Sequence, residues 1–355
     1  MLRLLTAGES HGQGMVAILE GLCAGLKIDI QAINRELKRR QAGFGRGRRM
    51  KIENDRVQII SGLKNNRSLG SPITLLINNK DASIEKLHKV LAARPGHADL
   101  AGLLKYGFTD IREVLERASA RSTVATVALG ALGKRFLNEF GIVITSNVLS
   151  VGGESTKQGI ICKITEAIEN KDTVGGIFEV LIKHVPAGLG SYVQADRRLD
   201  SRLAAAIIAI PGIKSFEVGL GLGYGVSFGS EVHDAIYYGR KKGLPAGRQG
   251  YFRLSNNAGG IEGGISNGQE IILRACMKPI STLLKPLDSV HIHTKKSMKA
   301  AVERSDICVV ESAGVVAEAA SALVLADAFL EKFGGDCLED IKNSYKSYLK
   351  RIAHA

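Results

Sequence analysis

The chain has 355 residues, of which 45% are apolar and 23% charged, and this balance excludes an intrinsically disordered protein. The formal net charge of +13 indicates an anionic partner: nucleic acid, an acidic membrane surface or a heavily charged small molecule. Aromatic residues make up only 5%, which disfavours a protein that stacks single-stranded bases on aromatic side chains.

The five cysteines are scattered and include no C-x-x-C pair, so we expect neither a disulfide framework nor a metal site. Residues 1–5 are too short for the apolar region of a signal peptide. No uninterrupted apolar run approaches the roughly 18 residues of a membrane span, since residues 15–30 are interrupted by Glu20, Lys27 and Asp29. These features predict a cytoplasmic protein that does not associate with membranes.

The hydrophobic pattern alternates between the two periods of secondary structure. In chain order it predicts a helix over 31–40, strands over 57–62 and 73–78, a helix over 109–140, strands over 142–151 and 176–185, a helix over 196–209, strands over 215–219 and 270–277, and helices over 312–332 and 338–352. This order indicates an α/β or α+β protein. A doubly wound nucleotide-binding fold is disfavoured, because no G-x-G-x-x-G follows the first strand and no P-loop sequence occurs. The glycine alternation at 219–223 is interpreted as a backbone bend.

The first candidate site is G-E-S-H-G at residues 8–12, directly after an apolar opening. The flanking glycines allow a sharp turn that exposes His11, a side chain that can deliver a proton near neutral pH. The same letters match the G-x-S-x-G nucleophile elbow, so a serine hydrolase that uses Ser10 is an alternative, provided that strand, elbow and helix follow one another. A glycine-rich turn with a solvated histidine is the third interpretation.

The second candidate is the basic segment 38–51, which contains no acidic residue. Its basic residues are Lys38, Arg39, Arg40, Arg46, Arg48, Arg49 and Lys51, interleaved with glycines at 43, 45 and 47. Arginine pairs bidentately with phosphate or carboxylate, so the segment is typical of a loop that closes over a compact anion. A solvated face or a nucleic-acid patch is the competing interpretation, and a basic nucleic-acid-binding module therefore stays open.

Two further candidates follow in the next hundred residues. R-P-G-H-A-D at 94–99 places His97 beside Asp99, which can fix the tautomer of the imidazole. Arg117 and Arg121 lie four residues apart and are expected to share a helix face. The alternative is that Glu113 and Glu116 neutralise these arginines in surface pairs.

The last candidates lie in the C-terminal third. Segment 256–268 contains two Gly-Gly pairs, which let backbone N–H groups approach a ligand closely. After one predicted strand, Lys278 is followed by the hydroxyls of Ser281 and Thr282, a set that can bind an anion. Arg304 and Asp306 in E-R-S-D are either an exposed pair or a phosphate clamp beside a proton acceptor.

Taken together, seven motifs resemble the chorismate synthase family over essentially the whole chain. They are G-E-S-H-G at 8–12, G-R-G-x-R-M at 45–50, R-P-G-H-A-D at 94–99, E-R-x-S-A-R at 116–121, N-N-x-G-G-x-x-G-G-x-x-N-G at 256–268, K-P-I-x-T at 278–282 and E-R-S-D at 303–306. The resemblance implies a single large α+β domain over 1–355, a β-α-β sandwich with antiparallel sheets around helices. It also implies a lyase of the shikimate pathway that eliminates phosphate from 5-enolpyruvylshikimate 3-phosphate (EPSP) to give chorismate and requires reduced FMN.

The resemblance carries roles to individual residues. It implies that His11 protonates the departing phosphate, that His97 hydrogen-bonds and protonates the reduced flavin, and that Asp306 assists proton movement near the flavin. Substrate contacts are implied for Arg46, Arg49, Arg121 and Arg304. Cofactor contacts are implied for Arg40, Arg46, Arg117, Ala118, Ser119, Pro211, Gly212, Gly263, Lys278, Pro279, Ile280, Ser281, Thr282 and Arg304.

The resemblance further implies a homotetramer, with NADPH or a separate reductase to reduce the flavin, and it explains the positive charge without nucleic acid. The chain departs from the family pattern at four positions: Ser122 stands where the family has Glu, Thr126 where it has Arg, and Gly212 and Ser215 alter the segment at 211–215. Segment 240–250 is interpreted as a small basic insertion. The departures affect the expected flavin contacts and leave the acid–base residues in place.

Overall fold

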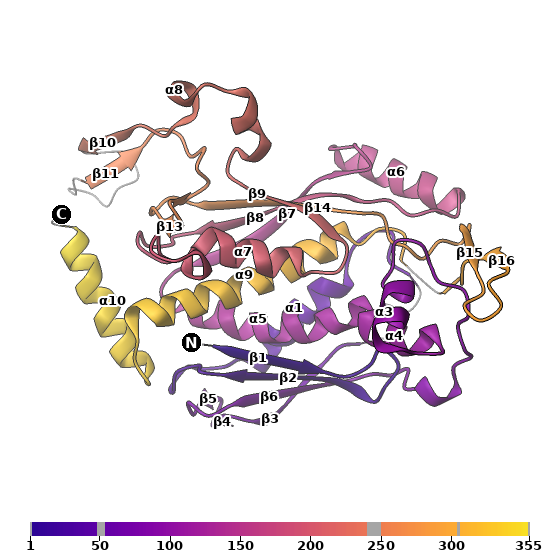
Figure 1. Cartoon of the computed structure of the whole chain (residues 1–355). Helices are drawn as coiled ribbons and strands as arrows, with labels where there is room; N and C mark the ends of the chain where they lie inside the picture. The colour runs from indigo at the N-terminus through magenta and orange to yellow at the C-terminus, as the bar shows by residue number, and fades with distance from the viewer. Residues whose placement is uncertain (1, 48–53, 240–249, 304–305, 354–355) are drawn as a thin grey trace.

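The chain forms two four-stranded antiparallel sheets with a layer of helices between them (Figure 1). The computed structural model describes residues 2–47, 54–239, 250–303 and 306–353. One hydrophobic core extends from the first sheet through the helices to the second. The α+β class and the sandwich of antiparallel sheets around helices, both implied by the resemblance, are confirmed.

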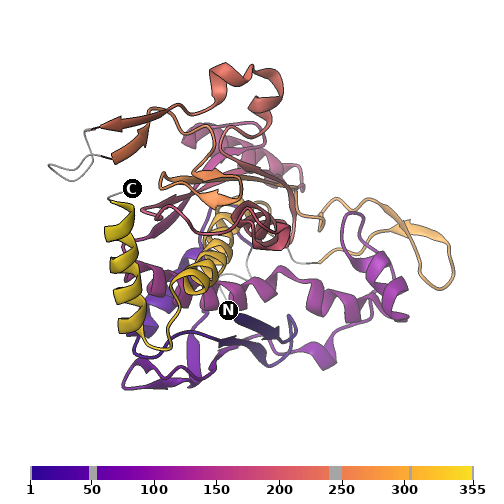
Figure 2. The same cartoon turned by 60° about the vertical axis from the view of Figure 1, so that its left-hand side comes forward.

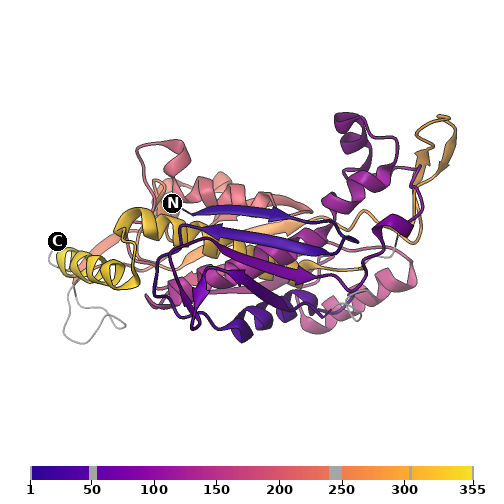
Figure 3. The same ribbon diagram turned by 90° about the horizontal axis from the view of Figure 1, so that it is seen from below.

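The first sheet has the order β1-β2-β6-β3, with β1 at Arg3–Ala7, β2 at Gly14–Glu20, β6 at Ile73–Asn78 and β3 at Val57–Ser61. Alternate residues of β2 and β6 are buried, as a strand with one face on a core requires. The buried set is Met15, Ala17, Leu19, Ile73, Leu75 and Ile77. These residues face the helices, and no element of the described residues covers the other face of the sheet (Figure 3).

The second sheet has the order β7-β8-β14-β9. Its strands are β7 (Val143–Val151), β8 (Gly176–Lys183), β14 (Ile271–Met277) and β9 (Ile213–Val218). Phe178, Val180 and Ile182 of β8 are buried against the helix layer.

The helix layer contains α1 (Ile30–Gln41), α5 (Thr123–Asn138), α7 (Leu199–Ile208) and α9 (Val310–Phe333). Helix α5 packs on the first sheet, α9 packs on the second, and the two helices pack on each other. Their contact is close because Gly130 has no side chain: a Cβ atom there would lie 2.3 Å from the Cβ of Ala319. Helix α9 is long and apolar enough to cross a membrane by length and composition, but 89% of that window is buried inside the protein, as expected of a core helix.

The remaining elements lie around this sandwich (Figures 1 and 2). Helices α3 (Asp99–Tyr106) and α4 (Ile111–Ala118) lie near the hairpin β15 (Asp288–Val290)–β16 (Ser297–Lys299) at one end. Helix α10 (Leu338–Ile352) lies at the other end, where an arm carries α8 (Gly229–Val232), β10 (Ile236–Gly239) and β11 (Gly250–Arg253) away from the body. The others are α6 (Lys157–Glu169), β4 (Leu63–Lys64), β5 (Arg67–Ser68), β12 (Ile261–Glu262), β13 (Ile265–Ser266) and the 3-10 turns at Ile84–Lys86, Ala120–Ser122, Ala195–Arg197 and Gly221–Val226.

The predicted elements are confirmed with small shifts in their bounds, apart from the helix over 109–140. That segment contains α4, a 3-10 turn and α5, because Ser119 adopts an extended conformation (φ −67°, ψ 142°) and its hydroxyl accepts a hydrogen bond from the Arg121 N–H. Strands β1 and β2 and helices α3 and α6 were not predicted, and neither were helix α8 and the short strands β4, β5, β10, β11, β12, β13, β15 and β16. The glycine alternation at 219–223 runs into the 3-10 turn Gly221–Val226.

Candidate active site

The turn between β1 and β2 presents His11 and is held in place by two buried side chains, Asn79 and Glu116. Gly8 begins the turn at φ +115°, and a Cβ atom there would lie 2.3 Å from the carbonyl oxygen of Gly14, so only glycine fits. The amide Nδ2 of Asn79, at the end of β6, donates to the carbonyl oxygens of Glu9, Ser10 and Gly12 at 2.8–3.3 Å. Three contacts from one amide fix the path of the turn.

Glu116 in the last turn of α4 fixes the imidazole of His11. Its Oε2 accepts the backbone N–H of His11 at 2.7 Å, and its Oε1 lies 2.9 Å from the ring Nδ1. Glu116 is 5% exposed. Burial alone would raise the pKa of Glu116, but the hydrogen bonds from His11 outweigh it and hold this pKa below its usual range.

The nucleophile-elbow interpretation of Ser10 is wrong in its structural context. The segment after the turn is strand β2, whereas the elbow requires a helix. Ser10 is 3% exposed, and its N–H donates to the carbonyl oxygen of Glu116 at 2.9 Å. The solvated-turn interpretation fails as well, because the side chain of His11 is 18% exposed.

A buried ion cluster lies beside this turn. Both oxygens of Asp55 are engaged, one by Arg40 and one by Arg121, each at 2.7 Å. Arg121 also donates through Nε to Asn79 Oδ1 at 2.8 Å, which connects the cluster to the His11 turn. Burial lowers the pKa of Arg40, and the positive charges of Arg121 and Arg46 lower it further against the attraction of Asp55. Anionic ligands are therefore favoured at this position.

Arg46 and Asp306 meet at the edge of the same cluster. Their side chains approach to 3.3 Å, and Asp306 accepts the N–H of Gly47 at 2.5 Å. The 43–47 loop is attached to the segment before α9, since the Ile307 N–H donates to the Gly45 carbonyl oxygen at 2.8 Å. The end of α1 is attached to the first turn of α9, since the Ser312 hydroxyl donates to the Arg40 carbonyl oxygen at 2.7 Å. The Nε atoms of Arg40 and Arg46 are buried and have no hydrogen-bond partner among the described residues.

The described part of the basic segment 38–51 is not a solvated basic face. Arg39 pairs with Glu318 and Glu36, Arg40 pairs with Asp55, and Arg46 pairs with Asp306. Of the four described basic residues, only Lys38 is exposed without a carboxylate at salt-bridge distance in the described structure. This distribution weakens the nucleic-acid interpretation.

The expectation that Arg117 and Arg121 share a helix face is wrong, because the helix ends between them at Ser119. Arg121 is buried, whereas Arg117 is exposed and donates to the carbonyl oxygens of Thr6 and Gly8. The alternative of surface pairs with Glu116 is wrong too, since Glu116 binds His11.

His97 belongs to a second cluster, just before α3. Its Nδ1 lies 2.5 Å from Asp99 Oδ1, and Asp99 is also held by the guanidinium of Arg94 at 2.9–3.0 Å. Burial alone would raise the pKa of Asp99, but the hydrogen bonds from His97 and Arg94 hold it well below its usual range. The sequence predicted that Asp99 lies beside His97 and can fix its tautomer, and an ionised Asp99 can accept the Nδ1–H, which directs Nε2 to another partner.

The K-P-I-S-T segment closes over the same loop. Arg94 donates to the Thr282 hydroxyl at 2.6 Å, and the Ser281 hydroxyl donates to the Gly96 carbonyl at 2.7 Å. The ammonium of Lys278 donates to the Ser281 hydroxyl at 2.7 Å and to the same carbonyl. The pKa of Lys278 is lowered by burial and by the charge of Lys214.

The other predicted residues fall into three groups. Gly212, next to Pro211, joins the His97 cluster because its carbonyl accepts the Lys278 N–H at 2.9 Å; Ala118 and Ser119 end α4 beside the His11 turn. The hairpin β12–β13 carries Gly263 at its tip. It lies at the opposite end of the folded protein from α3 and α4 (Figure 1). Arg49 and Arg304 lie outside the described residues, as do positions 240–249 of the basic insertion.

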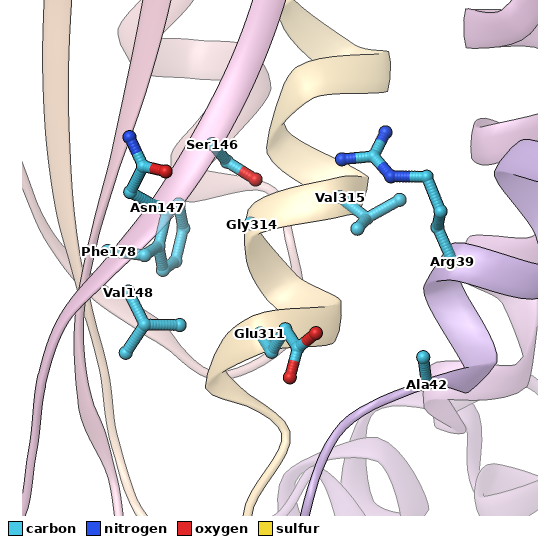
Figure 4. Close-up of a pocket in the computed structure, with 9 residues that line it drawn as sticks. All are labelled: Arg39, Ala42, Ser146, Asn147, Val148, Phe178, Glu311, Gly314 and Val315. Atoms are coloured by element: carbon cyan, nitrogen blue, oxygen red, sulfur yellow. The ribbon is translucent and has the colours of Figure 1, made fainter. Parts of the chain in front are cut away.

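A cavity of about 130 Å³ lies between α1, α9 and the second sheet (Figure 4). It is lined by Arg39, Ala42, Ser146, Asn147, Val148, Phe178, Glu311, Gly314 and Val315. Of these residues only Arg39, in the basic segment 38–51, belongs to a candidate site that the sequence indicated. Ligand sites usually measure about 300–1,000 Å³. The cavity is therefore too small for a nucleotide-sized cofactor and belongs to the charge network around Glu318.

The sequence did not predict Asn79, Asp55, Arg94 or the partnership of Glu116 with His11. Asp55 and Asn79 meet Arg121 from 66 and 42 residues away, so no local spacing indicates either contact. Asp99 carried a signal, because it lies two residues from His97.

Comparison with known proteins agrees with this arrangement. Residues 2–330 match the model of the chorismate synthase family. The chain is 50% identical over 351 residues to the chorismate synthase of Thermoanaerobacter pseudethanolicus, with 98% of each chain covered, and 47% identical over 390 residues to that of Geobacter sulfurreducens, with 99% of each covered. A chorismate synthase crystal structure superposes with a TM-score of 0.81 at 39% identity, covering 100% of this chain and 99% of that one.

The match includes every described residue of the His11, Asp55 and His97 clusters. The chain therefore belongs to the chorismate synthase family, whose activity is that of a lyase in the shikimate pathway.

Proposed function

We propose that the two histidine clusters form the site at which phosphate is eliminated from EPSP to give chorismate. The substrate carries two carboxylates and a phosphate, and bound FMN adds a second phosphate. Such charge requires several cations in a site that excludes water. The observation that supports the proposal most directly is the set of Arg40, Arg46 and Arg121, gathered beside His11 around Asp55 and Asp306.

The described residues fit an anionic cofactor. The buried Nε donors of Arg40 and Arg46 have no partner among the described residues, and Lys278 presents an ammonium between hydroxyl and carbonyl groups. Residues that would hold FMN are His97, Gly212, the segment Lys278–Thr282 and the end of α4. Reduced FMN, when bound, supplies the transient electron donation that assists C–O cleavage, which no side chain can supply.

The two histidines have different positions and different proposed roles. His11, held through Nδ1 by Glu116, presents Nε2 and donates a proton to the departing phosphate. His97, held through Nδ1 by Asp99, presents Nε2 to the flavin and holds a proton there. Asp306 keeps Arg46 and the backbone of Gly47 in place and exchanges protons near the flavin.

The remaining parts of the proposal come from family membership. We propose a homotetramer, a cytoplasmic location and flavin reduction by NADPH or by a separate reductase. Exposed apolar side chains support assembly: Leu5 on the first sheet is 66% exposed, and Leu222 and Phe228 on the arm are 82% and 77% exposed.

An anaerobic assay with EPSP and photoreduced FMN, followed by chorismate absorbance, tests this function. Wild-type protein is expected to form chorismate only when reduced FMN is present. His11→Ala and His97→Ala are each expected to lower kcat about 10²–10⁴-fold, the range of general acid–base catalysis. Near-wild-type turnover in either variant would refute that residue's role.

The same preparations separate the alternatives. A hydrolase would lose activity in Ser10→Ala and retain it without flavin. A nucleic-acid-binding protein would bind mixed-sequence duplex with an affinity that falls steeply as salt is added.

A further inference from the structure

We infer that Glu116 is a positioning residue that sets the tautomer and the orientation of His11, so that Nε2 faces the reacting phosphate. The inference rests on the proposed function for the identity of the phosphate. The tautomer and orientation of His11 are inferred from the geometry of the turn. It assigns a role to the Glu of E-R-A-S-A-R, for which the sequence predicted no part in the site.

Three contacts attach the His11 turn to this one residue. The carboxylate accepts the backbone N–H of His11 at Oε2 and lies against the ring Nδ1 at Oε1, and the Glu116 carbonyl accepts the Ser10 N–H at 2.9 Å. A carboxylate can only accept, so the ring must donate from Nδ1, and Nε2 carries the other lone pair or the second proton. A ring turned by 180° would place a carbon atom, in place of Nδ1, against Oε1.

Glu116 also places a negative charge next to the ring. The charged groups near the pair are Arg112, one turn earlier on α4, Arg117 on the Gly8 carbonyl, Glu9 in the turn, and Arg121 behind Asn79. Asp99, in contrast, shares its charge between His97 and the guanidinium of Arg94. Among the described residues, Glu116 is the carboxylate that contacts His11.

Glu116→Gln tests the inference because it inverts the hydrogen-bond pattern while keeping the shape. The backbone N–H of His11 can only donate, so the amide oxygen must turn toward it, and the NH₂ group then faces Nδ1. The ring must accept there, and its proton moves to Nε2. We expect kcat to fall about 10²–10⁴-fold, as for loss of an oriented acid–base group, while KM for the substrate changes little.

The pH profile gives a readout that a merely structural role would not move. Without the negative charge beside the ring, the proton leaves at lower pH, so the alkaline limb of kcat should shift to lower pH in E116Q. Glu113→Gln is the matched control, because Glu113 is exposed one turn earlier on α4, and it should keep the wild-type kcat and profile. An E116Q enzyme with both wild-type kcat and wild-type profile would overturn the inference.

A spectroscopic measurement on the wild-type protein remains decisive even if E116Q fails to fold. Nitrogen NMR of protein labelled at histidine, with the His11 signal assigned by its loss in His11→Ala, is expected to show a protonated Nδ1 at neutral pH. An unprotonated Nδ1 would overturn the inference. Absence of lyase activity in wild-type protein would instead overturn the proposed function, since the NMR result does not depend on turnover.

Discussion

At the scale of single residues, the site depends on carboxylates that hold cations and histidines in place. Asp55 is completely buried and receives Arg40 and Arg121 from two different elements. In a buried carboxylate between two guanidiniums, the attraction between the charges offsets the cost of removing them from water. If one partner is removed, the other is left as a buried charge without this compensation. The geometry of the arginines therefore depends on a residue that needs no contact with the substrate.

Asp55→Asn is expected to lower the free energy of unfolding by about 3–5 kcal/mol, the cost of removing one partner from a buried ion pair. Denaturant unfolding measures this change. Asp200→Asn is the control, because Asp200 pairs with Arg198 at the surface, where such pairs contribute about 0–1 kcal/mol. Equal stability of the two variants would contradict a structural role for Asp55.

At the scale of elements, one buried carboxylate connects α9 to several of the elements that it packs against. Glu318 is fully buried and accepts from Arg39 of α1, Lys134 of α5 and the Ser146 hydroxyl of β7. Burial would raise the pKa of Glu318, but these three partners outweigh it and hold the pKa below its usual range. One side chain thus connects three helices and the second sheet.

This shift predicts a loss of stability in acid. Because the pKa of Glu318 is lower in the folded chain than in the unfolded one, the unfolded state takes up the proton first as the pH falls. The contribution of Glu318 to the free energy of unfolding is complete above the ordinary glutamate pKa of about 4.3 and is lost as the pH falls below it. Unfolding measured between pH 3 and pH 7 (about the range of carboxyl titration) should show a shallower pH dependence in Glu318→Gln than in wild type. Parallel plots of the free energy of unfolding against pH for the two proteins would contradict this role of Glu318.

At the scale of the whole molecule, the outer face of the first sheet is the feature that one chain does not explain. Leu5 lies opposite Ile18, and Val16 lies opposite Leu76, so apolar side chains continue across β1, β2 and β6 on the face turned away from the helices. Ile60 on β3 is 61% exposed. Figure 3 shows no element of the same chain over these strands.

We expect a second copy of the chain to cover this face, in line with the proposed homotetramer. Sedimentation velocity should give four times the chain mass for wild type and a smaller mass for Leu5→Lys, because a lysine there buries a charge in the contact. Ile168→Lys, at an exposed apolar position on α6, should keep the wild-type mass. A monomeric wild-type protein would contradict the expectation.

Much of this architecture could be predicted from the sequence, since hydrophobic periodicity is local. The strands at 73–78 and 270–277 were predicted from short runs of β-favouring residues, and the structure buries alternate residues of both. Helix α9 was predicted because its apolar residues continue for six turns. The break at Ser119 was missed, because a serine hydroxyl that caps its own turn leaves no mark in the pattern. The contacts of Asp55 with Arg121, of Asn79 with the His11 turn and of Glu116 with His11 join residues more than forty positions apart, beyond any local signal.

The buried acid in α9 has a consequence during synthesis. The helix contains a window with a mean hydropathy of 1.7, in the range of segments that the insertion machinery delivers to a bilayer. An acidic side chain near the helix centre opposes that transfer by about 2.5–3.5 kcal/mol on the scale measured for aspartate. Arg39 and Lys134 precede Glu318 along the chain, so both cations that receive this carboxylate are synthesised before it. We therefore expect the segment to pack into its own protein in preference to a bilayer.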